Sequence, residues 1–292
     1  MAHEAALKPA RRPGPCETLG APNQFLLGTI RKPPEWRETL ASFETYNNSF
    51  PHAKLTRSSN GVLEVVLHTD GDTLVFNGYT HTEFVELFHQ IGADADNRVV
   101  ILTGAGRAFI DNIDPEGFDF FTPRGFDKIY REGKKLLWNI LDISAPLIVA
   151  LNGPATVHSE YALLADIVFA TPDTIFQDKP HLNFGIVPGD GVHSLWQEVI
   201  GPIRGRTFLL TQQIIGADEA KTLGVISEIV PRDRLMDRAR EVAAQLTKLP
   251  PLTTSYARVA FTQKLRRLVD ESVGYGLALE GISAADVARM NA

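Results

Sequence analysis

Two short runs of the sequence are almost entirely apolar and leave no polar side for solvent. They are Val99–Thr103 and Leu147–Leu151, and each is followed directly by a turn that contains glycine. A strand with one wet face alternates apolar and polar residues, whereas a strand that is covered on both faces does not. Between these two runs lies a segment whose apolar residues recur at helical spacing. The sequence therefore predicts an α/β protein whose strands are covered by helices on both faces.

The remaining elements follow from periodicity and from turn residues. We expect further strands at 62–67, 167–170, 174–177 and 225–230, and helices that start near Thr80 and then cover 129–141, 232–246, 254–268 and 272–288. Thr80 and Glu83 form a capping-box pattern, which predicts that the first long helix begins at Thr80. The last helices carry more apolar surface than a solvated helix needs, which favours contact with another subunit or domain.

Composition divides the chain into three regions. Residues 1–52 form a proline-rich N-terminal arm and lead-in, with basic residues scattered between the prolines. Residues 53–231 contain the regular alternation of strands and helices and are expected to form the α/β core. Residues 232–292 are expected to form a helical region for oligomerisation. An arm of this composition is typical of an extended segment that stays mobile or lies across a neighbour.

Composition also excludes several classes of function. The chain has 292 residues, a hydrophobic fraction of 44% and a formal net charge of −6, which together indicate an ordinary globular protein and not a general nucleic-acid binder. A single cysteine permits neither an intrachain disulfide nor a thiolate metal cage. No run approaches the ~20 apolar residues of a membrane span. We therefore expect a cytoplasmic protein with no membrane or nucleic-acid partner.

Three familiar site patterns are incomplete in this sequence. Gly104 and Gly106 follow a strand but lack the third glycine of a dinucleotide-binding turn, so a tight turn is the better interpretation. His81 and His89 share one face of a predicted helix but lie about two turns (~12 Å) apart, too far to bind one metal ion. We interpret both as surface or boundary histidines. No Gly-x-Ser-x-Gly motif is present.

The segment 176–191 carries the strongest candidate for chemistry. It leaves a predicted strand, has no helical period, and contains several glycines and prolines that let the chain fold back on itself. His181 and Asp190 could then meet as an imidazole and the carboxylate that orients it, which makes a histidine a better base. Alternatively, Asp190 only caps the helix that starts near Val192.

His158 and Glu280 are further candidates. His158 lies where a buried strand passes into a helix, a common place for an active site in α/β proteins, although it could equally be a satisfied boundary histidine. Glu280 lies in an apolar helical run, where a carboxylate must either face solvent or find a partner.

Several of these segments together resemble the crotonase (enoyl-CoA hydratase/isomerase) superfamily. The segments that carry the resemblance are 99–104, 108–114, 147–153, 163–168 and 184–189. The resemblance covers nearly the whole chain after Ala53. It implies a spiral of β-β-α turns, a C-terminal helical trimerisation region, and a homotrimer or a dimer of trimers.

Three motifs are similar to the branch of 6-oxocamphor hydrolase and other β-diketone hydrolases. They are Asn-Gly-Pro followed by a histidine at 152–158, Thr-x-Phe-Gln-Asp-x-Pro-His at 174–181, and Gly-Ile-Val-Pro-Gly-Asp-Gly-x-His at 185–193. This likeness implies that the active site contains His158, His181, Asp190 and Glu280, with Phe76 and Phe118 against the substrate. Phe76 stands where the branch has a tryptophan, so it keeps an apolar wall and lacks the indole N–H donor.

The resemblance implies a hydrolase that cleaves a carbon–carbon bond of a small alicyclic β-diketone by a retro-Claisen reaction and gives a keto acid. In this reaction His181 oriented by Asp190 can be the base, and His158, alone or paired with Glu280, can stabilise or protonate the carbanionic oxygen or carbon. Either histidine could perform either proton transfer. The second carbonyl stabilises the departing enolate, so we expect neither a metal ion nor an organic cofactor.

Two alternatives stay open at this point. One is a superfamily enzyme that acts on acyl-CoA substrates, although the stretches 110–114 and 156–160 lack the glycines that usually admit a thioester. The other is a non-catalytic protein that binds RNA through the basic stretch 264–267. Such a stretch is more often a solvated helix face.

Overall fold

A computed structural model describes residues 41–290, so most of the N-terminal arm expected at 1–52 lies outside the described residues. Within that range, six strands form one sheet in the order β1-β2-β4-β6-β7-β10. Their bounds are β1 Ala53–Arg57, β2 Val62–Leu67, β4 Val99–Gly104, β6 Leu147–Leu151, β7 Ile167–Ala170 and β10 Glu228–Ile229. β1 is antiparallel to β2, and the other neighbours are parallel. The expected α/β class with a mostly parallel sheet is confirmed.

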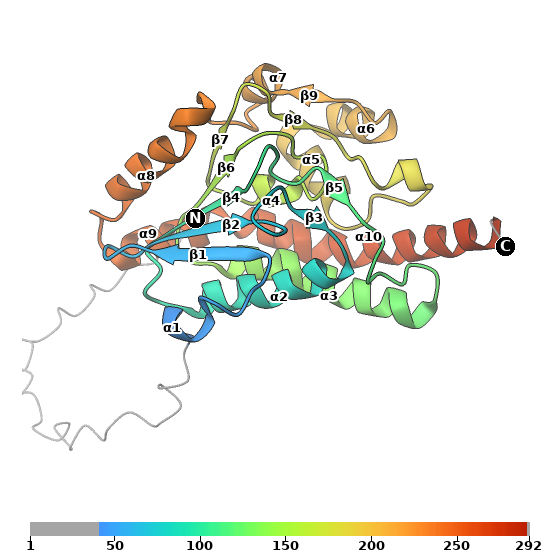
Figure 1. Ribbon diagram of the computed structural model, residues 1–292. Coiled ribbons are helices and arrows are strands. Elements are labelled where there is room, and N and C mark those ends of the chain that lie inside the picture. Colours follow the sequence, from blue (N-terminus) through green and yellow to red (C-terminus); the bar gives the residue numbers. More distant parts are fainter. Residues whose placement is uncertain (1–40, 291–292) are drawn as a thin grey trace, which may run out of the picture. The chain divides into compact units, whose positions relative to one another are not determined.

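Helices cover both faces of this sheet, as the continuous apolar strands predicted (Figure 1). Alternate residues of one strand enter two different clusters of buried side chains. Val100 and Leu102 pack with α2 (Gly78–Ala93) and α3 (Pro123–Asp142), while Val99 and Ile101 pack with α8 (Leu235–Leu246) on the opposite face. Burial on both faces leaves these strands no solvent side, which is why their sequences do not alternate.

Shorter elements complete the fold around the carboxyl ends of the strands. β3 (Val75–Phe76) pairs with β5 (Asn112–Ile113) in parallel, and β8 (Ile175–Phe176) pairs with β9 (Ile215–Gly216) in antiparallel orientation. The other helices are α1 Phe43–Tyr46, α4 Glu160–Leu163, α5 Val192–Ile200, α6 Pro202–Leu210, α7 Ala217–Thr222, α9 Pro251–Phe261 and α10 Gln263–Met290. Single 3-10 turns occupy Leu182–Phe184 and Arg232–Arg234.

Several helix boundaries differ from the sequence-based prediction, among them the start of α3, which lies at Pro123 and not near residue 129. α2 begins at Gly78, because the Asn77 side chain accepts hydrogen bonds from the N–H groups of Tyr79 and Thr80, both at 3.0 Å. Thr80 is therefore the third residue of the helix and not its first. The expected break between 268 and 272 is absent: α9 already ends at Phe261, and α10 runs without a break from Gln263 through Gly274 and Gly276. Gly276 is required there, because a Cβ at this position would meet the Gly189 carbonyl oxygen at 2.4 Å.

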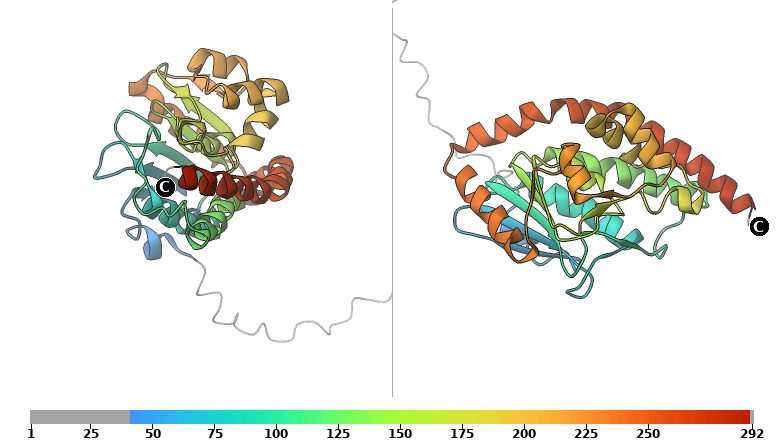
Figure 2. Two further views of the ribbon diagram at one scale, coloured as in Figure 1. Left: turned by 90° about the vertical axis from the view of Figure 1, so that its right-hand side faces the viewer. Right: turned by 90° about the horizontal axis from the view of Figure 1, so that it is seen from above.

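The expected region 232–292 packs against the core over most of its length. α8 lies on the sheet, while α10 runs along α3 and α5 (Figure 2). Part of the expected lead-in also belongs to the core, since Tyr46 is buried in the main hydrophobic cluster. α9 and α10 keep several large apolar side chains exposed, among them Leu252, Tyr256, Phe261 and Ile282. No helix in the described range is long and apolar enough to cross a membrane.

One buried arginine ties α9 to the core. Arg258 is 2% exposed, and its guanidinium donates to the carbonyl oxygen of Ile143 at 2.7 Å and to Asp166 at 2.5 Å. A further hydrogen bond reaches the carbonyl of Ile140 at 3.2 Å, at the end of α3. These bonds compensate a charge that would otherwise be buried without a partner.

Replacing Arg258 with alanine should therefore destabilise the fold strongly. Removal of one member of a buried ion pair leaves the other charge uncompensated, and we expect a loss of about 3 kcal/mol in the free energy of unfolding. Arg266→Ala is the matched control, because Arg266 also pairs with a carboxylate of α3, Asp142, but its side chain is 31% exposed. Its loss should cost less than about 1 kcal/mol. Denaturant unfolding followed by circular dichroism measures both. Equal losses would show that Arg258 does not tie α9 to the core.

Candidate active site

A cavity of about 420 Å³ lies between the strand-end loops, α3 and α10. Most of its wall is apolar and comes from side chains such as Phe118, Phe120, Leu136, Ile186 and Leu277. The ionisable side chains on its wall, within the described part of the chain, are His81, His158, Glu160, His181, Asp190 and Glu280. An apolar hollow with a few converging polar groups is the usual form of a site for a small molecule.

His181 lies on the loop after β8 and is held from behind by a carboxylate. Its Nδ1 lies 2.6 Å from an Oδ1 of Asp178, which is buried. Its Nε2 faces Asp190 at 3.6 Å. The structure thus differs from the expectation that Asp190 orients His181. Asp178 takes that place, because the short loop from β8 returns His181 onto the residue three positions before it.

Asp190 lies between the two histidines. Its Oδ2 is 3.6 Å from Nε2 of His181 and 3.6 Å from Nδ1 of His158. The alternative role as a helix cap is also present in weak form, because the N–H of Val192 donates to Asp190 Oδ1 at 3.4 Å. Gly189 lets this loop touch α10, since a Cβ there would meet the Gly276 carbonyl oxygen at 2.3 Å.

His158 sits in a backbone conformation that favours glycine, with φ at +49°. Its Nδ1 is 2.6 Å from Oε1 of Glu160, a carboxylate with no exposed surface. The imidazole stacks on Tyr161, and Phe76 packs against it with ring centres 4.1 Å apart. Glu160 therefore takes the place for which the sequence suggested Glu280. The reason is local: Glu160 is the first residue of α4, and it follows His158 by only two positions in the chain.

The two phenylalanines lie differently from one another. Phe118 lines the cavity, whereas Phe76 is fully buried behind His158 and is not part of the wall. Its expected role as a substrate-facing wall therefore needs correction. Phe76 lies on β3, which pairs with β5, and it meets the site through its contact with the His158 ring.

Glu280 lies on α10, and the charges of His181, Asp190 and His158 act on its carboxyl group. It lines the cavity and is only 5% exposed, and its Oε2 has no hydrogen-bond partner among the described residues. Burial raises the pKa of Glu280 to about 8, although the nearby charge of His181 opposes this shift. At neutral pH its carboxyl group is therefore mainly protonated.

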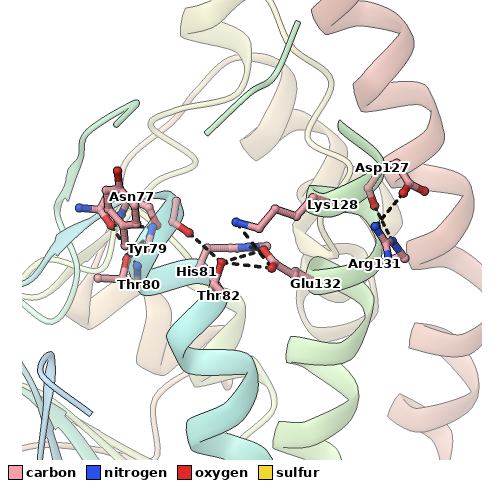
Figure 3. Close-up of polar contacts among 10 residues, drawn as sticks. Asn77, Tyr79, Thr80, His81, Thr82, Asp127, Lys128, Arg131 and Glu132 are labelled. Atoms are coloured by element: carbon pink, nitrogen blue, oxygen red, sulfur yellow. Dashed lines mark hydrogen bonds and ion pairs between the residues drawn. The ribbon is translucent and has the colours of Figure 1, made fainter. Parts of the chain in front are cut away.

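The sequence interpretation of His81 as a surface or boundary residue is wrong. His81 is 5% exposed and lines the cavity from the first turn of α2, whereas His89 is exposed as expected. Its Nδ1 lies 3.0 Å from Oε2 of Glu132 on α3 (Figure 3). The helical spacing could have predicted that His81 is buried, because His81 lies three residues before Phe84 and seven before Phe88, both of which are buried core residues.

Burial opposes the charged form of every one of these groups, and their neighbours decide the result. For His181, Asp178 and Asp190 outweigh burial and raise its pKa well above the usual value. Glu160 and Asp190 likewise outweigh burial at His158 and raise its pKa, though less than the pKa of His181 is raised. The charges of His181 and His158 in turn lower the pKa of Asp190. The neighbouring carboxylates thus favour the protonated form of both imidazoles, and the imidazoles favour the ionised form of Asp190.

His158, Glu160 and Asp190 also offer one ligand atom each within 4.8 Å of one another. Such spacing is compatible with a metal ion, but Nδ1 of His158 is engaged by Glu160 at 2.6 Å. A metal would have to replace that hydrogen bond and to displace the proton it holds. The donor set as it stands is that of an acid–base site.

The basic stretch 264–267 does not form a free cationic face. Lys264 contacts a carboxylate oxygen of Glu198, and Arg266 pairs with Asp142 at 2.5 Å. Two of its three cations are thus neutralised by their own chain, which removes most of the support for an RNA-binding surface.

Comparison with known proteins places this geometry in a family. A sequence profile described as enoyl-CoA hydratase/isomerase matches residues 57–275. The chain belongs to the crotonase superfamily. A crystal structure of a β-diketone hydrolase from the cyanobacterium Anabaena sp. PCC 7120, bound to (S)-3-oxocyclohexyl acetic acid, is 53% identical in sequence. The match has a TM-score of 0.82 and covers 83% of this chain and 98% of that one.

Two further crotonases are less similar to this chain than the Anabaena enzyme is. Carnitinyl-CoA dehydratase from Escherichia coli K12 is 29% identical over 234 residues, which are 76% of this chain and 84% of that protein. An enoyl-CoA hydratase/isomerase from Mycobacterium paratuberculosis shares the fold with a TM-score of 0.72 at 23% identity, and the match covers 80% of this chain and 94% of that one. The resemblance to the crotonase superfamily and to its β-diketone hydrolases is thereby confirmed.

Backbone and side-chain groups in the stretches 110–114 and 156–160, where a superfamily enzyme would bind a thioester, form hydrogen bonds within this chain. The N–H of Val157 donates to the carbonyl of Ile110 at 3.2 Å. Asp111 is also engaged, because its Oδ1 accepts from the Thr156 hydroxyl at 2.5 Å and its carbonyl accepts from Lys179 at 2.9 Å. In the region that the sequence showed to lack glycines, these groups thus bind within the chain itself.

The raised pKa of Glu280 predicts how stability depends on pH. Between its ordinary pKa of 4.5 and its native value of about 8, the native carboxyl keeps a proton that the unfolded chain has lost. The native state thus binds more protons, and raising the pH through this range lowers stability by at most about 1.4 kcal/mol per pH unit. Glu280→Gln cannot ionise and should escape this loss.

Urea unfolding of the wild type and of Glu280→Gln, at several values from about pH 5 to about pH 8, measures this difference. The free energy of unfolding of the variant minus that of the wild type should become more positive as the pH rises. The other ionisable groups are common to both proteins and cancel in the comparison. A difference that stays constant with pH would contradict a protonated Glu280.

Proposed function

We propose that this protein is a hydrolase that cleaves a carbon–carbon bond in a small, ring-shaped β-diketone and releases a keto acid. The observation that carries the proposal is the pair of imidazoles, His158 and His181, on either side of Asp190 in an otherwise apolar cavity. An apolar cavity of this volume suits an alicyclic carbon skeleton, and the imidazole pair suits a reaction in which two oxygens become negative.

The reaction needs proton transfer and charge stabilisation but no electron transfer. The oxygen of water forms a bond to one carbonyl carbon, and the carbonyl π pair moves onto its oxygen. When this tetrahedral intermediate collapses, the carbon–carbon bond breaks and its electron pair becomes the enolate of the second carbonyl. One proton of water ends on the enolate carbon and the other on the new carboxylic acid. Water and diketone thus account for every atom of the product.

The two imidazolium rings suit the developing charges. The pKa of His181 and that of His158 are both raised by neighbouring carboxylates, which favours the protonated rings that could donate to an alkoxide or an enolate oxygen. Asp178 and Glu160 fix the orientation of these rings from behind. The sequence suggested His181 as the base, and the charges around it favour the donor role at neutral pH.

The similar Anabaena enzyme supports the choice of substrate. Its bound ligand, (S)-3-oxocyclohexyl acetic acid, is a ring ketone with a carboxylic acid arm. Addition of water across a carbon–carbon bond of a bicyclic β-diketone yields a compound of this type. We propose the same substrate class for this chain and not an acyl-CoA, because the bonds at Val157 and Asp111 occupy the region that would receive a thioester.

A substrate panel tests this proposal. Incubation with cyclic and bicyclic β-diketones should give products heavier by one water, detected by mass spectrometry, while a crotonyl thioester of coenzyme A should be neither bound nor converted. Calorimetry should detect no micromolar affinity for that thioester. Turnover of the thioester, with no product from any diketone, would overturn the proposal.

Variants of the imidazole pair give a second test. Asp190→Asn removes the charge between His158 and His181 and should lower kcat by roughly 10²–10⁴-fold, with little change in KM. His181→Ala should cost a similar factor. The double variant should cost little more than either change, because the two residues act as a unit. His158→Ala should add partly to their effect.

The cap role of Asp190 provides the control for that series. Asparagine caps a helix about as well as aspartate does. If Asp190 served only to cap α5, the Asn variant would keep a kcat near that of the wild type, and the proposed imidazole pair would be wrong.

A further inference from the structure

Asp190 lies close to two imidazoles of the cavity but beyond hydrogen-bond distance of either. Its Oδ2 is 3.6 Å from Nε2 of His181 and 3.6 Å from Nδ1 of His158, so each contact is an ion pair and not a hydrogen bond. The three residues also belong to three different segments, because His158 precedes α4, His181 follows β8 and Asp190 precedes α5. The packing of these segments therefore decides how close the charges come.

Trp196 on α5 connects the Asp190 loop with α4. It lies six residues after Asp190 in the chain and is fully buried. Its indole N–H donates to Oγ of Ser159 at 3.0 Å, and α4 packs against α5 (Figure 1). Ser159 directly follows His158. Because a buried indole N–H needs such a partner, this hydrogen bond sets how α5 lies against the start of α4.

The same hydrogen bond holds Ser159 beside a strained point of the backbone. His158 has a φ of +49°, a conformation that a residue with a side chain keeps only where its surroundings hold it. Ser159 is the N-cap of α4, a position where a serine hydroxyl ordinarily accepts from an N–H of the helix. Here the hydroxyl forms no such cap and accepts from Trp196 instead. The indole thus holds the backbone on one side of His158.

The ring of Trp196 makes a second contact on the His181 side. It meets the ring of Phe176 edge-on, with ring centres 5.4 Å apart. Phe176 belongs to β8 and lies two residues before Asp178, whose carboxylate holds Nδ1 of His181. One side chain therefore touches the segments that carry both imidazoles, while its own helix begins two residues after Asp190.

We propose that Trp196 is the positioning residue that sets the distances between Asp190 and the two imidazoles. It acts through Ser159 and Phe176 and not on the substrate, because neither Trp196 nor Ser159 lines the cavity. The interaction of two charges weakens as they move apart, and a small displacement in an active site lowers its rate strongly. The kinetic part of this inference rests on the proposed function, whereas the effect on the imidazoles is measured without substrate.

Ser159→Ala removes the acceptor of the hydrogen bond and leaves the indole in place. The backbone beside it should relax, and the imidazole of His158 should move away from Asp190. We expect kcat to fall by roughly 10–10²-fold, the size of effect that a displacement of about 1 Å produces. KM should change little, because neither partner of the bond lines the cavity.

A histidine NMR titration of the unliganded protein gives a second readout, which a purely structural role would not move. Burial opposes the raised pKa of His158, and the charge of Asp190 is one of its causes. In Ser159→Ala this pKa should fall by about one unit as Asp190 recedes. The pKa of His181 should fall less, because Asp178 still holds its Nδ1. The charged and titratable groups that act on His158 are Glu160 on α4, Asp190 before α5, His181 after β8, His81 on α2 and Glu280 on α10.

Phe208→Leu is the matched control. Phe208 on α6 also packs against the indole of Trp196, with ring centres 4.5 Å apart, and it is equally buried. Its replacement loosens the packing around Trp196 and keeps the hydrogen bond to Ser159, and Phe208 does not line the cavity. We expect a lower melting temperature, with kcat and the pKa of His158 as in the wild type.

Trp196→Phe removes the same hydrogen bond from the donor side. Its kcat should fall at least as far as that of Ser159→Ala. The double variant should be little worse than Trp196→Phe alone, because both changes remove one interaction. Thermal unfolding verifies that each variant is folded at the assay temperature. If Ser159→Ala is not, the comparison of Trp196→Phe with Phe208→Leu decides instead.

The outcomes separate this inference from the proposed function. If the wild type adds water to no β-diketone, the proposed function fails, and the NMR titration still decides the role of Trp196. If the wild type is active and Ser159→Ala keeps both its kcat and the pKa of His158, the positioning role is overturned while the function stands. If Phe208→Leu reproduces the losses of Ser159→Ala, the positioning role is likewise overturned, because loosened packing alone then explains them.

Discussion

The site depends on a carboxylate, Asp190, that is held between two imidazoles away from bulk water. A buried charge is stable only with compensation, and here each charge is compensated by the next one. His158 and His181 face Asp190 at 3.6 Å, and each is held on Nδ1 by its own carboxylate. Removing any one member changes the protonation of the others. The site is therefore a coupled set of charges and not a collection of independent residues.

The sheet explains why this set can form at all. Both faces of β4 and β6 are covered by apolar side chains, and Thr103, which hydrogen-bonds the carbonyl oxygen of Ala150, is the one polar side chain on these two strands. Polar residues are left to the loops at the strand ends, where His158, His181 and Asp190 all lie. α10 closes this end, and the contact between Gly189 and Gly276 brings Glu280 to the same charges.

A consequence is that histidines of similar sequence context differ in charge. His181 and His158 have raised pKa values because carboxylates surround them, whereas the pKa of His81 is lowered because burial outweighs its single partner, Glu132. One cavity thus combines two imidazoles whose protonated form is favoured with a third whose neutral form is favoured. Hydrolysis of a carbon–carbon bond requires both, since water must lose a proton while the oxygens of the substrate gain negative charge.

The sequence by itself determined the α/β class, the positions of β2, β6 and β7, and the candidates His158, His181, Asp190 and Glu280 that the structure brings to one cavity. These follow from local patterns, namely continuous apolar runs, glycine-rich turns and motifs shared with a known superfamily. The start of α2 was misjudged for a local reason as well, because Asn77 competes with Thr80 as the cap.

Only the tertiary structure decided which groups are partners. Asp178 and Glu160 became the carboxylates behind the two imidazoles, Phe76 lay behind His158, and His81 turned inward to meet Glu132, which is 51 residues away in the chain. The pairing of His81 with Glu132 depends on how α2 and α3 pack against one another, and no spacing along the chain encodes it. Asp178 and Glu160 lie only three and two residues from their histidines, so the local path of each loop decides those two pairings. The protonation of each group follows from the same packing, because burial and neighbouring charge set a pKa and neither is a property of the residue alone.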